Sequence, residues 1–315
     1  MDGKAARIFT EQLIRAANKA DIVKRKLTYD LLNMGANEFC RLTKCIVGSQ
    51  DITTVADQAS YDLEPDYIMP YLKTEDPRGG KFFVHFNDGT TVHTILFKAY
   101  QKVIYDNQST AIAIPGNFTI HEKGSLGSQV TGTTTSAGAL SGGQATLTDS
   151  GGGLLTAVNA RDIVHNSSKD AVGVALSVTS DTALVTAIFN DVGNPVPWAS
   201  GDTYVIQPAA IKQLQFDPPT STAAYTATIH YIATPPPVYS DFGTWRVSDL
   251  YHPAFCFYAA HLYLGQDVIK SPDGGEVKIA MGAKYLNEFN RLVREAKSEI
   301  DAGLGKTGYS MRKKA

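Results

Sequence analysis

The stretch 253–264 is apolar at nearly every position rather than along one stripe: Pro-Ala-Phe-Cys-Phe-Tyr-Ala-Ala-His-Leu-Tyr-Leu. Pro253 suits the first turn of a helix, where its missing N–H costs nothing, and Gly265 suits a helix end. A helix that is apolar all round is a buried helix, and this one is shorter than the ~20 residues that a bilayer requires. The stretch therefore predicts a helix with protein packed on all sides. The large side chains of this core helix are Phe255, Phe257, Tyr258, Leu262 and Tyr263.

Helical spacing predicts three further helices, at 5–20, 24–47 and 276–301. The last of them has an apolar stripe with members mostly three and four residues apart, and charged residues on its other side. The members of this stripe are Ile279, Leu286, Phe289, Val293, Ala296 and Ile300. The predicted helices thus come from both ends of the chain.

Short β-favouring runs predict strands in the middle of the chain. They occupy 52–56, 61–63, 67–69, 81–86, 91–96, 117–121, 154–158, 162–164, 172–178, 183–189, 204–206, 211–217 and 224–232. Asn87-Asp88-Gly89 between two of these runs indicates a hairpin turn. Residues 123–153 are rich in Gly, Ser and Thr, which predicts a flexible or glycine-rich β connection.

The simplest topology places 117–121 in one sheet with 211–232, so that a β module is inserted into a hairpin of the main domain. We therefore predict an α+β fold: a helical bundle from both chain ends packed with a small antiparallel sheet, plus an inserted β-barrel or sandwich module. The predicted domains are a helical adaptor core with its sheet at 1–123 and 209–302, the inserted module at 124–208, and a C-terminal tail at 303–315.

Charge and cysteine content exclude several classes of protein. The formal net charge of −2 provides no global basic field for nucleic acid or a membrane surface. Three cysteines without close pairs are not a disulfide framework, and we interpret Cys40, Cys45 and Cys256 as small core residues. The N-terminus has no apolar signal core, so nothing indicates export.

No motif predicts a catalytic, cofactor or metal site. The seven histidines show no helical zinc spacing, and Cys40 and Cys45 lie five apart on a predicted helix, off a common face. Residues 303–307 end like a phosphate loop, but Ile300 stands where that loop needs a glycine, and a helix precedes it instead of a strand. There is no Gly-x-Ser-x-Gly nucleophile motif. We therefore predict that the protein is not an enzyme and needs no cofactor.

The order of several motifs resembles the head-to-tail adaptor proteins of tailed bacteriophages, also called head completion or neck proteins. The motifs are Asn37–Cys45, Thr53–Tyr67, Leu214–Pro219 followed by Tyr225–Tyr231, and Tyr251–Ala254 at the start of the aromatic helix. Glu64 departs from the family pattern, because it separates Leu63 from the usual proline. Two runs in the insertion, Asp162–Asn166 and Gly201–Ile206, resemble a small β module that recurs in phage structural proteins.

This resemblance implies a virion structural protein at the head-tail junction, assembled in the host cytoplasm. It implies a homo-oligomeric ring, usually twelvefold, whose helices pack against neighbouring copies around a DNA channel. The implied partners are the portal protein, a tail or nozzle protein and the phage DNA in the lumen, with no membrane. It also implies that the C-terminal tail docks into the portal. The residues of that docking tail are Lys306, Tyr309, Met311, Arg312, Lys313 and Lys314.

Two alternatives stay open from the residues alone. The basic tail has a second interpretation as a solvated chain end, which is common at termini. The inserted β module has a second interpretation as part of a tail-tip or fibre-type protein that binds the host surface.

Overall fold

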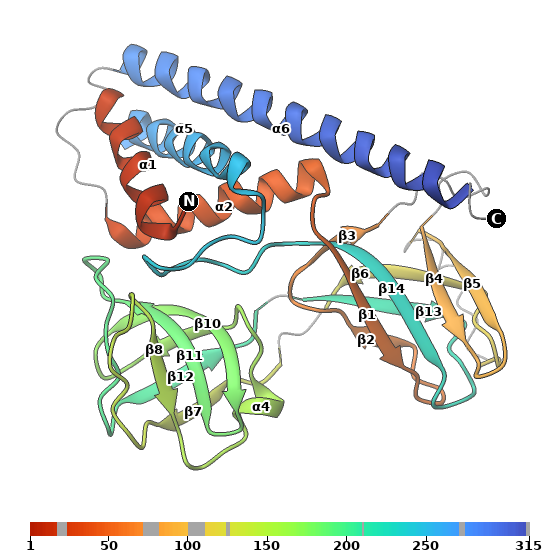
Figure 1. The fold of residues 1–315 in the computed structure, drawn as a ribbon. Helices are drawn as coiled ribbons and strands as arrows, with labels where there is room; N and C mark the ends of the chain where they lie inside the picture. Colours follow the sequence, from red (N-terminus) through yellow and green to blue (C-terminus); the bar gives the residue numbers. More distant parts are fainter. Residues whose placement is uncertain are drawn as a thin grey trace. The chain divides into compact units, whose positions relative to one another are not determined.

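A computed structural model describes residues 1–17, 24–71, 82–99, 111–123, 127–209, 211–270 and 275–312. The chain divides into two compact units. The first unit comprises 1–45, 128–208 and 234–315, and the second comprises 46–127 and 209–233. Figure 1 shows the elements of both.

Four long helices belong to the first unit: α1 (Gly3–Ala17), α2 (Arg25–Thr43), α5 (His252–Lys270) and α6 (Gly275–Arg312). A short 3₁₀ turn, Asp249–Tyr251, leads into α5. Helix α5 contacts the other three helices. It approaches α2 closely because Gly35 has no side chain, and a Cβ there would lie 2.9 Å from the carbonyl oxygen of Phe255.

The helix ends differ from the predicted ones for local reasons. Helix α2 ends at Thr43 rather than at residue 47, because Lys44 adopts a left-handed conformation (φ 57°) and its N–H bonds the carbonyl of Cys40 at 2.8 Å. Helix α6 continues past the predicted end at Asp301 to Arg312.

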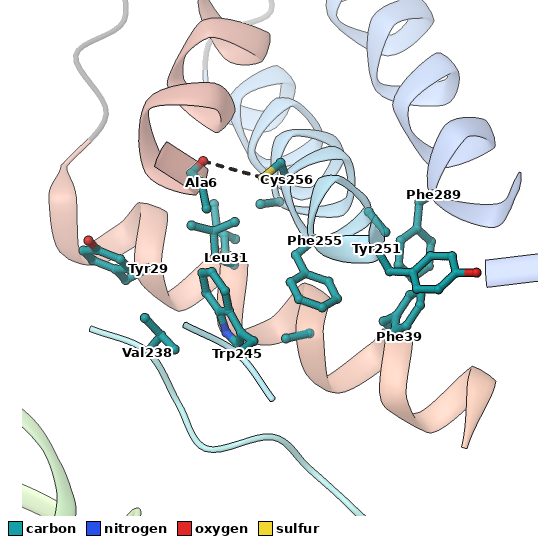
Figure 2. Packing of buried hydrophobic residues seen from close by; sticks show 14 of the residues in the cluster. Ala6, Tyr29, Leu31, Phe39, Val238, Trp245, Tyr251, Phe255, Cys256 and Phe289 are labelled. Carbon is teal, nitrogen blue, oxygen red and sulfur yellow. Dashed lines mark hydrogen bonds between the residues drawn. The ribbon is translucent and has the colours of Figure 1, made fainter. Parts of the chain in front are cut away.

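Aromatic side chains fill the core between these helices (Figure 2). Phe255 makes edge contacts with Phe39 at 5.5 Å and with Trp245 at 5.6 Å between ring centroids. Phe189 joins this cluster and lies 5.7 Å from Tyr239. The helical core is therefore continuous with the sheet that supplies Phe189.

That sheet of the first unit has six strands in the order β7-β12-β9-β10-β11-β8, and every neighbouring pair is antiparallel. The strands are β7 (Val130–Thr133), β8 (Ala145–Thr148), β9 (Ile163–Asn166), β10 (Ala171–Ser180), β11 (Ala183–Phe189) and β12 (Thr203–Gln207). We refer to 130–207 as the β module. Its core surrounds Trp198 and Leu147.

Two predictions in the β module are wrong. Residues 154–158 do not form a strand, because the short helix α4 (Leu154–Ala157) occupies them. Residues 123–153 are not only a connection, since they contain β7 and β8. The apolar residues Ala145 and Leu147 are buried, so two inward side chains are enough to fix β8 against β11.

The second unit is built on an eight-stranded sheet in the order β1-β14-β4-β5-β6-β13-β2, with β3 pairing with β14. The strands are β1 (Val47–Thr53), β2 (Ser60–Asp62), β3 (Tyr67–Pro70), β4 (Phe83–Asn87), β5 (Val92–Phe97), β6 (Asn117–Glu122), β13 (Lys212–Asp217) and β14 (Thr226–Ala233). The predicted hairpin is confirmed as β4–β5, where the Asp88 carboxylate accepts bonds from the amides of Thr90 and Thr91. The shared sheet of 117–121 and 211–232 is also confirmed, since β6 pairs with β13.

The predicted fold class, a helical bundle from both chain ends with a small antiparallel sheet, is wrong. Among the described residues, fourteen strands in two sheets dominate the structure. The larger sheet is not small, and it is not purely antiparallel because β5 and β6 run parallel. Alternation along the sequence locates single strands, but pairing depends on residues far apart in the chain, so the extent of each sheet was not apparent from the sequence.

Candidate interaction surfaces

Between Pro253 and Leu264, helix α5 is buried along one side and half-buried along the rest. Phe255 is fully buried, whereas the other four members of the core helix are half-buried: Phe257, Tyr258, Leu262 and Tyr263. The ring centroids of Phe257 and Phe9 lie 5.9 Å apart, and those of Tyr258 and Phe289 on α6 lie 4.7 Å apart. Burial on every face, as expected for 253–264, is thus incomplete, because the described parts of α1, α2 and α6 cover only some of its surface.

Four members of the predicted docking tail lie on the last turns of α6: Lys306, Tyr309, Met311 and Arg312. The structure describes their backbone as helical. Lys313 and Lys314 lie outside the described residues. On the same helix, Ile279 of the predicted apolar stripe is 61% exposed, whereas Phe289 and Ala296 are buried.

A pocket of about 400 Å³ opens where the end of α2 faces α6, and we name it the α2–α6 pocket. Its floor is apolar, and its rim carries the exposed residues Arg246, Ser248 and Glu299. The residues that line it are Phe39, Cys45, Arg246, Val247, Ser248, Tyr251, Ala296, Glu299 and Ile300.

The Tyr251 hydroxyl is the unusual polar group of this pocket. The residue is 6% exposed, and its buried oxygen lies near the Glu299 carboxylate but makes no hydrogen bond of good geometry within the described part of the chain. Burial, together with the nearby carboxylates of Glu299 and Glu295, raises the pKa of Tyr251 to about 12. The hydroxyl therefore stays protonated at neutral pH, and it is available to an incoming group.

The thiols of Cys40 and Cys45 lie 3.4 Å apart beside this pocket. The predicted position of the two cysteines, off a common helix face, is wrong, because the left-handed Lys44 ends α2 and folds Cys45 back towards Cys40. The hydrogen bond with Cys40 lowers the pKa of the Cys45 thiol below its ordinary value. Cys40 and Cys256 are buried and Cys45 is half-buried, and all three are free thiols.

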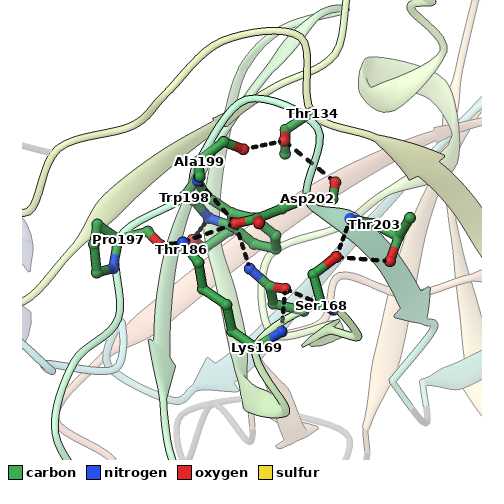
Figure 3. Close-up of polar contacts among 10 residues, drawn as sticks. Thr134, Ser168, Lys169, Thr186, Pro197, Trp198, Ala199, Asp202 and Thr203 are labelled. Atoms are coloured by element: carbon green, nitrogen blue, oxygen red, sulfur yellow. Dashed lines mark hydrogen bonds and ion pairs between the residues drawn. The ribbon is translucent and has the colours of Figure 1, made fainter.

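A buried carboxylate, Asp202, holds the loops of the β module together (Figure 3). It accepts hydrogen bonds from the Ala199 amide at 2.8 Å and from Asn166 Nδ2 at 2.9 Å, and Lys169 Nζ lies 2.9 Å away. Burial alone would raise the pKa of Asp202, but these hydrogen bonds outweigh burial and lower it below its ordinary 3.8. All three contacts are to Oδ2 of Asp202 and come from residues of the module, so the cluster is structural.

The β module is expected to lose stability in acid because of Asp202. Its folded-state pKa lies below the unfolded value, so its stabilisation is complete above about pH 5 and is lost as pH falls from 3.8 through the lower folded-state pKa. Trp198 is the sole tryptophan in a Trp245→Phe variant, and its fluorescence then reports the module. In that background, the melting temperature should fall between pH 5 and pH 3, and fall less when Asp202→Asn is added.

Asp191→Asn, on an exposed loop of the module, is the control and should keep the original pH dependence. An identical pH dependence in all three proteins would refute the role of Asp202.

One exposed aromatic residue was missed by the sequence analysis. Phe242 is 79% exposed, which is the largest exposure of any large apolar residue among those described. The sequence does indicate that Phe242 is exposed, because it lies between Asp241 and Gly243 in a turn-forming segment without apolar residues at helical or strand spacing. The pocket residues had no such signal, because they come from three separate segments of the chain, 39–45, 246–251 and 296–300.

The described residues contain neither a metal-binding cluster nor a membrane-spanning helix. No group of three or more His, Cys, Asp or Glu side chains in them could hold a metal ion. None of the helices in the part of the chain that the structure describes is both long and apolar enough to cross a membrane.

The family model of the SU10 adaptor protein matches residues 124–308, more than half of the 315-residue chain. The chain belongs to this family. It is therefore a bacteriophage structural adaptor protein and a component of the virion. A comparison with curated proteins finds no match to the chain.

The matched region covers part of the predicted resemblance. It includes the β module, the motifs at 214–219 and 225–231, and the start of α5 at 251–254. The two earlier motifs, at 37–45 and 53–67, lie before it. The β module is thus within the family pattern of this adaptor.

Proposed function

We propose that this adaptor forms a homo-oligomeric ring at the head-tail junction, where it connects the portal to the tail and continues the DNA channel. The match to the SU10 adaptor protein family over 124–308 carries the proposal. The ring has twelve copies, as the resemblance to head-to-tail adaptors implies. In this proposal the domains are the adaptor core (1–123 and 209–302), the inserted module (124–208) and the docking tail (303–315).

Incomplete burial of the helices supports contacts between copies. Tyr258 and Leu262 on α5 are only half-buried, and Val277 and Ile279 on α6 are exposed. Apolar area that a single copy leaves in water is available for burial against a neighbour. The ring places these helices side by side.

The charge balance supports a channel through which DNA slides. Strong binding of DNA requires many Lys or Arg contacts to phosphates. The net charge of −2 provides no such field. A lumen without a strong attraction for phosphates lets the genome pass in both directions.

Imaging of intact phage particles by electron microscopy tests the ring. The expected result is density for this chain as a closed ring between portal and tail. Density at the tail tip would favour the host-binding alternative, and presence in the infected cytoplasm but not in particles would contradict the proposal.

Truncation tests the docking tail. A chain that lacks 303–315 should melt at the temperature of the full chain, because the core lies before that segment, yet it should fail to attach to filled heads. The matched control removes two positive charges elsewhere on α6, with Lys284→Ala and Lys297→Ala on its exposed face, and should attach normally. Normal attachment by the truncated chain would rule out docking by the tail.

A further inference from the structure

Phe242 and the α2–α6 pocket occur in the same compact unit. Phe242 presents an almost fully exposed aromatic ring, and the α2–α6 pocket has apolar walls and a volume of about 400 Å³. A single copy leaves the ring of Phe242 in water, and the Tyr251 hydroxyl makes no hydrogen bond of good geometry in the described chain. The exposed ring of Phe242 lacks an apolar environment, and the pocket provides one.

The loop that carries Phe242 is held rigid. The amide of Phe242 donates a hydrogen bond to Ser240 Oγ at 3.1 Å. The neighbouring Asp241 forms an ion pair with Arg25 at 3.2 Å and accepts a 2.6 Å hydrogen bond from the Tyr29 hydroxyl. The ring also lies against Gly142, where a Cβ would come within 2.8 Å of it. A contact residue that is already ordered loses little entropy on binding.

Phe242 and the α2–α6 pocket lie at opposite ends of α2. Asp241 binds Arg25, the first residue of α2, whereas the pocket is lined by Phe39 and Cys45. Arg25 and Phe39 are fourteen residues apart, about 21 Å along a helix. Figure 2 shows Tyr29 at one end of the core, and Phe39 with Tyr251 at the other. The ring of Phe242 therefore does not reach the pocket of its own copy.

We propose that Phe242 of one copy inserts into the α2–α6 pocket of the next copy. Two different patches of one chain then meet, which is a head-to-tail contact, and repetition of such a contact closes a ring when the rotation allows. The inference thus rests on the proposed ring and gives its subunit contact. Phe39 and Tyr251 supply aromatic walls for the ring of Phe242, and the Tyr251 hydroxyl hydrogen-bonds the backbone of the entering loop.

The neighbourhood of the pocket fits this occupant. Leu250, next to Tyr251 in the chain, is 64% exposed and adds apolar surface to the segment that supplies the pocket. Arg246 and Glu299 provide a polar rim around an apolar floor, the usual arrangement at the centre of a protein interface.

Cysteine cross-linking tests the contact, because Cys45 already lines the pocket. Full-length Phe242→Cys protein, assembled on portal rings, is treated with a short bismaleimide that adds one thiol to each maleimide. The expected result is a ladder of covalent multimers on a denaturing gel. The Phe242→Cys, Cys45→Ser double variant should give no ladder, nor should Val192→Cys, whose site is 58% exposed on a loop of the same unit.

A mixture shows that the link joins two copies. A tagged Phe242→Cys, Cys45→Ser chain mixed with an untagged wild-type chain should give a cross-linked band with the summed mass. Absence of that band, while rings assemble, would overturn the inference and leave the proposed ring intact.

Two substitutions test the energetics without a new cysteine. Phe242→Ala should raise the concentration needed for half-assembly about 30-fold or more, as the loss of an aromatic hot spot does. Ser248→Trp, at the exposed rim, should block the mouth with a similar effect while the melting temperature stays unchanged. Normal assembly by both variants would refute the contact. If cross-links form in filaments or dimers while neither assemblies nor particles contain a ring, the contact is supported and the proposed ring is rejected.

Discussion

Replacing Phe255 by alanine should lower the free energy of unfolding by about 3–5 kcal/mol. The side chain is fully buried between α5 and α2, and its ring contacts Phe39 and Trp245. The backbone of α5 cannot move inward to fill the space, because Gly35 already holds the two helices in close contact. A cavity that the surroundings cannot fill gives the upper part of this range.

Urea unfolding followed by Trp245 fluorescence measures this loss in a Trp198→Phe background, where Trp245 is the remaining tryptophan. Phe242→Ala is the control, since it removes the same side chain from an exposed position and should change stability by less than about 0.5 kcal/mol. Equal effects of the two substitutions would mean that residues 253–264 are not the core of this unit.

The helices were predictable because their signals are local. The aromatic run of 253–264 with Pro253 in front specified α5, and the structure adds one residue before it and six after it. The end of α2 was not predictable, because it depends on Lys44 adopting a left-handed conformation that side chains other than glycine seldom take. That conformation also brings Cys45 to Cys40, so one unanticipated residue changed both a boundary and a contact.

The sheets were predictable strand by strand and not as sheets. Residues 154–158 have the apolar, β-favouring character of a strand, yet Leu154 is buried from a single helical turn, and a short apolar run fits either structure. The parallel pairing of β5 with β6 joins Leu96 to Asn117 and has no local signal in the sequence. Long-range pairing therefore decided the fold class.

Interaction surfaces were harder to predict than the core for the same reason. Phe242 was detectable as an aromatic residue in a turn, but the α2–α6 pocket combines residue 39 with residues 246–251 and 296–300. A structural adaptor functions through such composite surfaces rather than through a motif of catalytic residues. The family match gave the function, and the structure gave the residues with which to test it.

Replacing Trp198 by alanine should destabilise the β module by about 3–5 kcal/mol. Trp198 is 2% exposed, its Nε1 donates to Thr186 Oγ1 at 2.9 Å, and its ring meets Tyr204 edge-on at 6.4 Å. The substitution removes the largest side chain of that core and one buried hydrogen bond. Trp198→Phe keeps most of the volume and should cost less, about 1–2 kcal/mol for the lost bond and smaller ring.

Hydrogen exchange of the full-length chain separates the two cores in this experiment. Trp198→Ala should increase the exchange of amides in β9 and β12 more than the exchange of amides in α5. Strands β9 and β12 pair at Val164 and Ile206, which share a core with Trp198. Val192→Ala, on an exposed loop, is the matched control and should leave both regions unchanged. Faster exchange in α5 of the same size would show that the module and the helices unfold together, as the contact of Phe189 with Tyr239 permits. The size of the difference thus measures how firmly the module is coupled to the helices that the ring is proposed to bring together.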